Sequence, residues 1–189
     1  MNKTLLATGL AMAMVMPLSA SAADYVIDTK GAHASINFKV SHLGYSYIQG
    51  RFNTFDGNFS YDPDDISASS ITVNVDTKSL DSNHAERDKH IRSADFIDAS
   101  KYSTATFNST QVVDKGDGTF ELLGDLNLHG VTKPIVIQAQ VIGQGQDPWG
   151  GERVGFFGTT RLELADYKIP VMGASSYVDI ELHVEGIKQ

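Results

Sequence analysis

The stretch VDIELHVE, residues 178–185, indicates the fold class because apolar side chains alternate strictly with polar ones. Valine, isoleucine, leucine and valine take the even-numbered positions, whereas acidic residues and a histidine take the odd-numbered ones. A period of two places every second side chain on the same face of the backbone, which is typical of a β-strand with one buried and one solvated face. The segment therefore predicts a strand that forms part of a sheet with an apolar side.

The same alternation recurs along most of the chain, in segments 35–40, 48–61, 71–76, 105–115, 120–128, 135–141 and 153–164. A short apolar stretch at 25–28 adds a minor strand, and a one-residue change of phase near Thr54 predicts a β-bulge in a long, bent strand. Short connections favour an antiparallel order. Eight such strands form either a sandwich or a barrel, and closure removes exposed edges. We therefore expect an all-β, eight-stranded antiparallel barrel.

Residues 83–98 interrupt this pattern. A short helix is expected from His84 to Arg92, with Ser82 or Asn83 as its N-cap. The helix has few apolar positions, which indicates that it lies on the surface. Phe96 and Ile97 follow it and are expected to pin it to the barrel.

Length and composition limit the possible functions. The chain has 189 residues, a formal net charge of −8 and no cysteine. This length suggests one domain or two small ones. The negative charge argues against nucleic-acid binding and against attachment to an anionic membrane. The absence of cysteine excludes disulfides, thiolate metal sites and cysteine nucleophiles.

The first 22 residues have the pattern of a secretory signal peptide. Lys3 precedes an uncharged apolar run at 5–15, and the small-residue triplet at 20–22 forms an A-x-A cleavage site. We expect cleavage after Ala22, a mature domain of residues 23–189 and a periplasmic location. The run is too short for a membrane-spanning helix, and no later stretch is long enough, so an integral membrane protein is not expected.

Small residues recur on the apolar face of the predicted strands, at Gly50, Gly57, Ala105, Gly124, Ala139 and Gly158. Two interpretations remain open at this point. Small side chains could leave space for an elongated apolar guest, or the glycines could mark corners where the barrel coils sharply.

Several motifs occur in a fixed order. They are NF at 37–38 with HLG at 42–44, GRF at 50–52 with FDG at 55–57, HAERDKHIRSADF at 84–96, GDL at 124–126 with HGVTKP at 129–134, and DPWGG at 147–151. Together they resemble the YceI-like proteins, a polyisoprenoid-binding, lipocalin-like family, over residues 23–189. The run LADYK at 164–168 departs from the pattern of many relatives. The resemblance implies a lipocalin-like barrel with a long interior pocket for a polyisoprenoid or similar lipid, a helix over one end, and a possible homodimer.

Two sets of residues are candidates for binding such a lipid. The expected apolar wall comprises Phe38, Val40, Phe52, Phe59, Ile71, Val73, Phe107, Leu126, Leu128, Phe156 and Leu162. The alternative is that these side chains simply fill the core. The expected head-group site comprises His84, Arg87, His90 and Arg92. The alternative there is a solvated helix whose own acidic residues neutralise the cations. Tyr45, Tyr47 and Trp149 could frame an entrance or lie in surface loops.

No catalytic residue, metal site or cofactor is expected. Glu86 with His90, and His84 with Asp88, have metal-ligand spacing but lack a third ligand in register. Motifs of serine hydrolases, zinc proteases and nucleotide-binding enzymes are absent from the sequence. The favoured function is a periplasmic lipid-binding protein for transport or storage. A lipid-modifying enzyme using the same pocket, or a stress-linked interaction protein with a filled barrel, are the alternatives.

Overall fold

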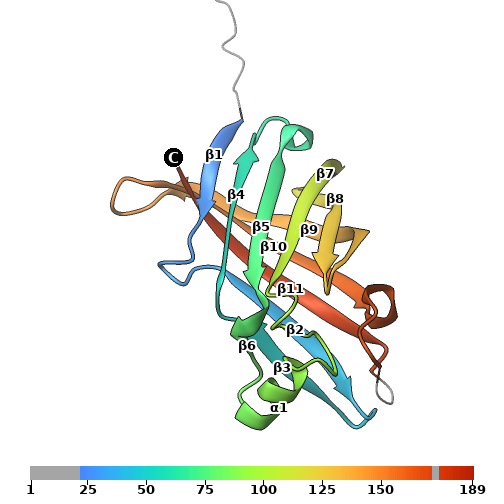
Figure 1. The fold of residues 1–189 in the computed structure, drawn as a ribbon. Helices are drawn as coiled ribbons and strands as arrows, with labels where there is room; N and C mark the ends of the chain where they lie inside the picture. The colour runs from blue at the N-terminus through green and yellow to red at the C-terminus, as the bar shows by residue number, and fades with distance from the viewer. Residues whose placement is uncertain (1–21, 172–174) are drawn as a thin grey trace, which may run out of the picture.

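An antiparallel sheet closes on itself to form the barrel in the computed structural model, which describes residues 22–171 and 175–189 (Figure 1). The strands are β1 (Ala23–Ile27), β2 (Ser35–His42), β3 (Ser46–Phe52), β4 (Phe55–Tyr61), β5 (Ser70–Asp76), β6 (Leu80–Asp81), β7 (Thr104–Gly116), β8 (Thr119–Leu128), β9 (Val131–Gln146), β10 (Glu152–Glu163) and β11 (Tyr177–Lys188). The helix is α1 (Ala85–Ile91), and the 3₁₀ turns are η1 (Ile66–Ala68), η2 (Thr77–Ser79) and η3 (Leu164–Tyr167). The predicted signal peptide, except Ala22, lies outside the described residues.

Interruptions of the strands explain how these segments form an eight-stranded barrel. β11 pairs with β10 on one side, and on the other side with β2 and then with β1. β3 pairs with β2 while β4 pairs with β1, and β6 pairs with β3 while β5 pairs with β4. Each of the pairs β1–β2, β3–β4 and β5–β6 is therefore one interrupted strand of the barrel. Together with β7 to β11 they confirm the predicted eight-stranded antiparallel barrel, and the minor strand at 25–28 belongs to the first interrupted strand.

The change of phase near Thr54 corresponds to a break between β3 and β4, whereas the sequence predicted a bulge within one strand. The backbone N–H of Asn53 donates to the carbonyl of Ser79 at 3.1 Å, and the N–H of Thr54 donates to Ser79 Oγ at 3.0 Å. The turn η2 thus accepts the hydrogen bonds of the two linking residues. This contact comes from a segment 25 residues away, so local alternation gave no sign of it.

The two ends of the barrel differ in packing. At one end, which we call the closed end, lie the β4–β5, β7–β8 and β9–β10 loops. Tyr25, Phe59 and Tyr61 are buried there, with the rings of Tyr25 and Phe59 stacked at a centroid distance of 5.0 Å. Phe156 meets Phe59 and Tyr61 edge-on at 5.6 and 5.3 Å. Aromatic pairs of this geometry stabilise a well-packed cluster, and this cluster fills the closed end of the barrel.

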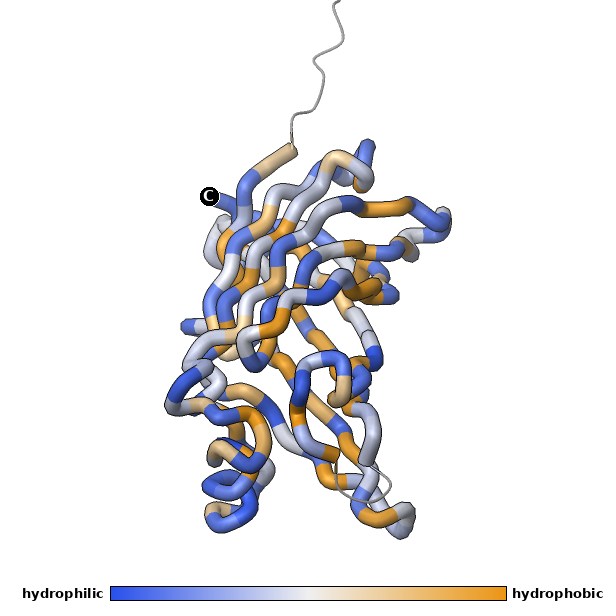
Figure 2. Tube along the Cα trace, turned by 45° about the vertical axis from the view of Figure 1, so that its right-hand side comes forward, coloured by the Kyte–Doolittle hydropathy of each residue, from blue (hydrophilic) through white to orange (hydrophobic). Residues whose placement is uncertain are grey.

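The other end, which we call the mouth, is formed by the β2–β3 turn, by α1 with the residues after it, and by the segment that follows β10. These three groups lie at the lower end of the molecule in Figures 1 and 2. The described part of the last segment is held to the barrel by a hydrogen bond from Ser175 Oγ to the carbonyl of Ser41. The mouth is therefore assembled from segments that are far apart in the sequence.

The helix α1 is short and largely exposed, as predicted, but its cap differs from the prediction. His84 is the N-cap, and its Nδ1 accepts from the N–H of Arg87 at 3.2 Å. Ser82, one of the two expected caps, instead donates its N–H to the buried carboxylate of Asp88 at 2.8 Å. Asn83, the other expected cap, takes a left-handed conformation with φ of 63°. Satisfying a buried carboxylate outweighs a local cap, because an unpaired buried charge is costly.

Aromatic rings lie over several of the small residues on the inner face. A Cβ added at Gly50 would lie 2.3 Å from Cζ of Phe38, and one at Gly124 would lie 2.4 Å from Cζ of Phe107. Gly50 and Gly124 therefore make room for phenyl rings of neighbouring strands, whereas Gly158 faces the interior of the barrel. The interpretation that small residues leave space for a guest does not apply to Gly50 and Gly124.

Candidate ligand-binding cavity

A cavity of about 690 Å³ runs inside the barrel from the aromatic cluster at the closed end to the mouth. Its lining is almost entirely apolar and includes side chains of β2 to β5 and β7 to β11. Pockets for small organic ligands commonly enclose 300–1,000 Å³ and have mostly hydrophobic walls. Polar lining side chains lie mainly toward the ends, and those at the mouth are Ser41, His42, Arg87, His90 and Ser175. The arrangement suits a ligand with a long apolar body and a polar group near the mouth.

All eleven residues of the expected apolar wall line this cavity: Phe38, Val40, Phe52, Phe59, Ile71, Val73, Phe107, Leu126, Leu128, Phe156 and Leu162. They lie there because they share the inward phase of their strands. Ala105, Ala139 and Gly158, three of the small inner residues, also line the cavity. Contact of these side chains with a ligand stays a prediction.

Two of the four expected head-group residues reach the cavity. Arg87 lines the mouth, while its Nε donates to Ser82 Oγ at 2.7 Å and its Nη2 donates to the Ser82 carbonyl. His90 also lines the mouth, with its ring edge-on to Phe96 at 4.9 Å and Nε2 3.7 Å from a carboxylate oxygen of Asp95. His90 is exposed, so it has the freer side chain of the two for meeting a ligand.

The other two expected head-group residues serve the local fold. His84 caps α1, and the Nη1 of Arg92 donates to the carbonyls of Lys78 and Leu80 at 3.0 Å each. Neither residue is among those that line the cavity. The four residues therefore do not converge on one site, although they are close in sequence, because the helix and its supporting carbonyls direct them to different partners.

The sequence did not identify several residues at the mouth as candidates for binding. Leu43, Phe96, Ile97, Ile169 and Pro170 line the cavity there. They lie in turns and loops, where alternation gives no information about which side chains point inward. The one available signal was the placement of apolar residues in otherwise polar connections.

The three aromatic residues considered for an entrance do not lie together. Tyr45 and Tyr47 belong to the β2–β3 hairpin at the mouth, and both are exposed. Trp149 is also exposed but lies in the β9–β10 hairpin at the closed end. The sequence could not separate these residues, because the end of the barrel on which a hairpin lies depends on strand order.

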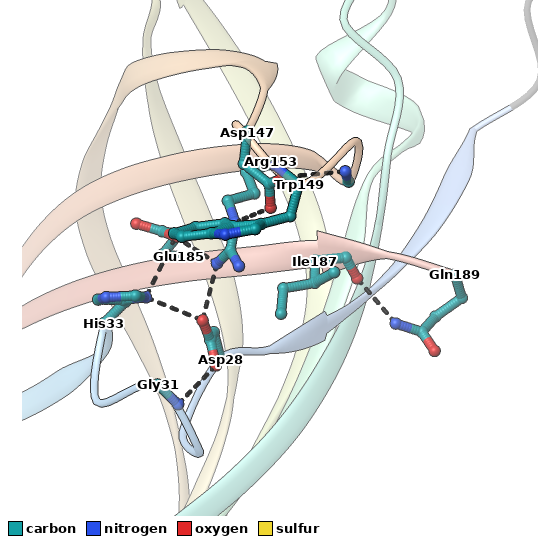
Figure 3. A network of polar contacts seen from close by, with 10 residues as sticks. Asp28, Gly31, His33, Asp147, Trp149, Arg153, Glu185, Ile187 and Gln189 are labelled. Atoms are coloured by element: carbon teal, nitrogen blue, oxygen red, sulfur yellow. Dashed lines mark hydrogen bonds and ion pairs between the residues drawn. The ribbon is translucent and has the colours of Figure 1, made fainter.

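A second polar cluster lies on the outside of the barrel, near the closed end (Figure 3). The Arg153 guanidinium donates to Asp28 and Asp147 at 2.7 Å each and to Glu185 at 2.6 Å. The hydrogen bond from Arg153, more than any other contact, lowers the pKa of Asp28 from 3.8 to about 2. Paired in this way, Asp28 stays ionised although its side chain is only 6% exposed.

This cluster also contains the three groups best placed for a metal in the described residues. The ligand atoms of Asp28, His33 and Glu185 lie within 4.8 Å of one another. However, Nη1 of Arg153 already contacts both carboxylates. A guanidinium in this position supplies the positive charge that a cation would bring, so the group is an ion-pair cluster that joins β1, β10 and β11.

Within the described residues, none of the helices has the length and apolar character needed to cross a membrane. The comparisons with known proteins agree with the barrel fold. Residues 25–186 match the family described as the YceI-like domain. A UPF0312 protein of Vibrio cholerae is 77% identical over 189 residues, covering 100% of both chains.

Two solved structures illustrate the likeness in fold. The Campylobacter jejuni YCEI protein superposes with a TM-score of 0.72 and 25% identity, covering 80% of this chain and 91% of that one. A polyisoprenoid binding domain from Saccharophagus degradans gives a TM-score of 0.65 at 18% identity, covering 89% of this chain and 100% of that one. At such identities the likeness establishes the barrel fold.

Proposed function

The chain belongs to the YceI-like family, and we propose that it binds a long-chain isoprenoid or similar lipid inside the barrel and carries or stores that lipid in the periplasm. The observation that carries this proposal is the cavity of about 690 Å³ with apolar walls along the length of the barrel. The polyisoprenoid binding domain of Saccharophagus degradans, which has the same fold, supports the choice of ligand class.

The energetics of this cavity favour a long hydrocarbon chain over a compact polar ligand. Burying each methylene group is worth roughly 0.8 kcal/mol, so a ten-carbon segment gains about 8 kcal/mol before the entropic cost of binding. The deep walls provide few hydrogen-bonding groups to compensate a polar ligand for lost hydration. A polar head is better placed at the mouth, near His90 and Arg87.

Binding without chemistry is the function that these groups support best. The guanidinium of Arg87 is engaged by Ser82, and the aromatic end of the cavity contains few polar atoms. A filled barrel, the third possibility from the sequence, does not agree with a cavity of this size. A lipid-modifying enzyme would be favoured if the protein turned over a polyprenyl phosphate and lost this activity on His90→Ala substitution.

The first test is the identification of the lipid that copurifies with the protein. Mass spectrometry of an organic extract from the mature protein, isolated from the periplasm of the exporting bacterium, should find a stoichiometric long-chain lipid. Intact mass should also show an N-terminus at Ala23. Repeated recovery of empty protein from cells rich in isoprenoid lipids would contradict the proposal, and a retained leader would contradict the expected cleavage.

The second test obstructs the cavity. Ala139→Phe adds a ring on the lining side of β9, whereas Gln140→Phe adds the same ring at the exposed neighbouring position. Bound lipid should fall several-fold in the first variant and stay unchanged in the second. Both variants should keep the circular dichroism spectrum of a β-barrel. Equal lipid content in two well-folded variants would refute the assignment of the cavity as the binding site.

A further inference from the structure

Exposed apolar and aromatic side chains gather at the mouth of the barrel. Leu43 is 56% exposed, Tyr45 87%, Tyr47 60% and Val171 40%. We call these four residues the mouth rim. The first three belong to the β2–β3 hairpin, and Val171 follows β10. Apolar side chains are normally exposed singly, so a group of four around the opening of an apolar cavity requires an explanation.

The backbone at the tip of this hairpin is unfavourable for the residue that occupies it. Leu43 has φ of 53° and is followed by Gly44 with φ of 78°. Left-handed conformations suit glycine, asparagine and aspartate, and they are strained for a leucine. The turn therefore holds an exposed leucine where a polar residue would fold more easily. Strain of this kind is often found where a side chain serves a function, and Leu43 also lines the cavity.

The charges of the protein are distributed unevenly between the two ends. The three loops of the closed end contain Asp62, Asp64, Asp65, Asp117 and Asp147 and no basic residue. The mouth is balanced in charge, because the turn of the β2–β3 hairpin has no acidic residue, residues 85–101 contain four acidic and four basic residues, and Lys168 offsets Asp166 in the segment after β10. Lys39 extends over the ring of Tyr47 at 5.1 Å from its centroid. An anionic surface would thus repel the closed end more strongly than the mouth.

We propose that the mouth rim docks on the surface of a phospholipid bilayer, so that the cavity opens directly onto the lipid phase. Leucine inserts into the acyl boundary, and tyrosine rings with nearby lysines occupy the head-group level, which is the usual arrangement at membrane interfaces. The net charge of −8 would argue against membrane binding if it were spread evenly over the surface. In the proposed orientation the acidic loops of the closed end face away from the bilayer. The inference rests on the proposed function in that docking gives the lipid a path into the cavity that avoids water.

Vesicle flotation tests this docking. The mature protein should bind vesicles of phosphatidylethanolamine and phosphatidylglycerol, and more weakly those of phosphatidylcholine alone. Tyr45→Asp should lower the partition coefficient about tenfold. Leu43→Asn should lower it too, although asparagine suits the left-handed turn, so a loss cannot come from misfolding. The matched control is Ile142→Asp, because Ile142 is 64% exposed on β9 toward the closed end. Equal binding by all three variants would overturn the proposal.

Fluorescence tests the orientation. Trp149 is the one tryptophan of the chain and lies at the closed end. Its emission should stay constant on vesicle binding, whereas Tyr45→Trp in a Trp149→Phe background should give a blue shift. A blue shift of Trp149 with none at position 45 would overturn the proposal, because it would place the closed end on the membrane.

Failure of docking and failure of lipid binding can be told apart. Tyr45 does not belong to the cavity lining, so Tyr45→Asp should keep its content of bound isoprenoid while losing vesicle binding. A protein that binds vesicles but never an isoprenoid would contradict the proposed function alone. A rim that is covered by a second copy is the remaining outcome. Protein that is dimeric by sedimentation, becomes monomeric on Tyr45→Asp and ignores vesicles would refute membrane docking.

Discussion

Replacing Arg153 with methionine should destabilise the barrel and change how its stability depends on pH. The guanidinium pairs with Asp28, Asp147 and Glu185 at 2.6–2.7 Å, and the Asp28 side chain is only 6% exposed. Methionine keeps most of the side-chain volume but provides no hydrogen bonds. The Asp28 carboxylate would then be buried next to two other carboxylates, with only the N–H of Gly31 at 2.8 Å and the exposed ring of His33 at 2.9 Å as partners. We expect a loss of at least about 2 kcal/mol in the free energy of unfolding at pH 7.

The size and sign of the pH effect follow from Asp28. Its pKa is about 2 in the folded protein, against an ordinary value of 3.8, chiefly because of the hydrogen bond from Arg153. At about 1.4 kcal/mol for each unit between folded and unfolded pKa values, this difference is worth roughly 2 kcal/mol. Because the folded pKa is lowered, this stabilisation is fully present above pH 4 and is lost as the pH falls from about 4 toward 2. The variant lacks the part supplied by Arg153, which is the largest, and keeps only the smaller contributions of Gly31 and His33.

Urea denaturation of both proteins between pH 7 and pH 3 provides the measurement. The gap between wild type and Arg153→Met should be widest at neutral pH and should narrow as the solution becomes acidic. Arg161→Met is the matched control on the same strand. Arg161 also donates to an aspartate, Asp179, at 2.7 Å, but its side chain is 53% exposed. Its removal should cost much less. Equal losses in the two variants, or a gap that is constant with pH, would refute this reasoning.

Two further predictions concern local packing. Ser82→Ala should cost about 1–3 kcal/mol and speed hydrogen exchange in α1, because the buried Asp88 carboxylate loses a hydroxyl donor; unchanged exchange would contradict it. Gly50→Ala should cost about 1–3 kcal/mol by thermal or urea unfolding, because the new Cβ would lie 2.3 Å from the ring of Phe38. Gly143→Ala, where no atom lies within 4 Å, should leave stability unchanged, and similar losses at both positions would count against the explanation.

The sequence predicted the barrel and the residues on its inner face because both depend on the alternation of apolar and polar side chains along each strand. Alternation in a strand decides which side chains point inward, whatever lies on the neighbouring strand. Phe38, Phe107 and Leu162, for example, were identified from three separate segments and all line the cavity. Predicting these lining residues did not require the pairing order of the strands, since any closed antiparallel arrangement brings their apolar faces together inside the barrel.

The details that the sequence missed depend on contacts between distant segments. The break at Thr54 exists because η2 accepts the hydrogen bonds of the linking residues. The cap of α1 moves to His84 because Ser82 is occupied by a buried aspartate. Arg92 turns away from the mouth to bind backbone carbonyls of residues 78 and 80. In each case a local preference is overruled by a polar group that would otherwise be buried without a partner.

Tyrosines show most directly why sequence periodicity could not locate the opening of the cavity. Tyr25 and Tyr61 pack inside the closed end, where they are 8% and 6% exposed. Tyr45 and Tyr47 are 87% and 60% exposed at the mouth. All four occur in or beside strands of similar composition. Only the strand order decides that Tyr25 and Tyr61 join the aromatic cluster with Phe59, whereas Tyr45 and Tyr47 lie on the exposed hairpin at the mouth. The position of the mouth is therefore a property of the topology, and the difference in exposure between the two ends of the barrel marks the mouth as the end where we propose that an apolar ligand enters.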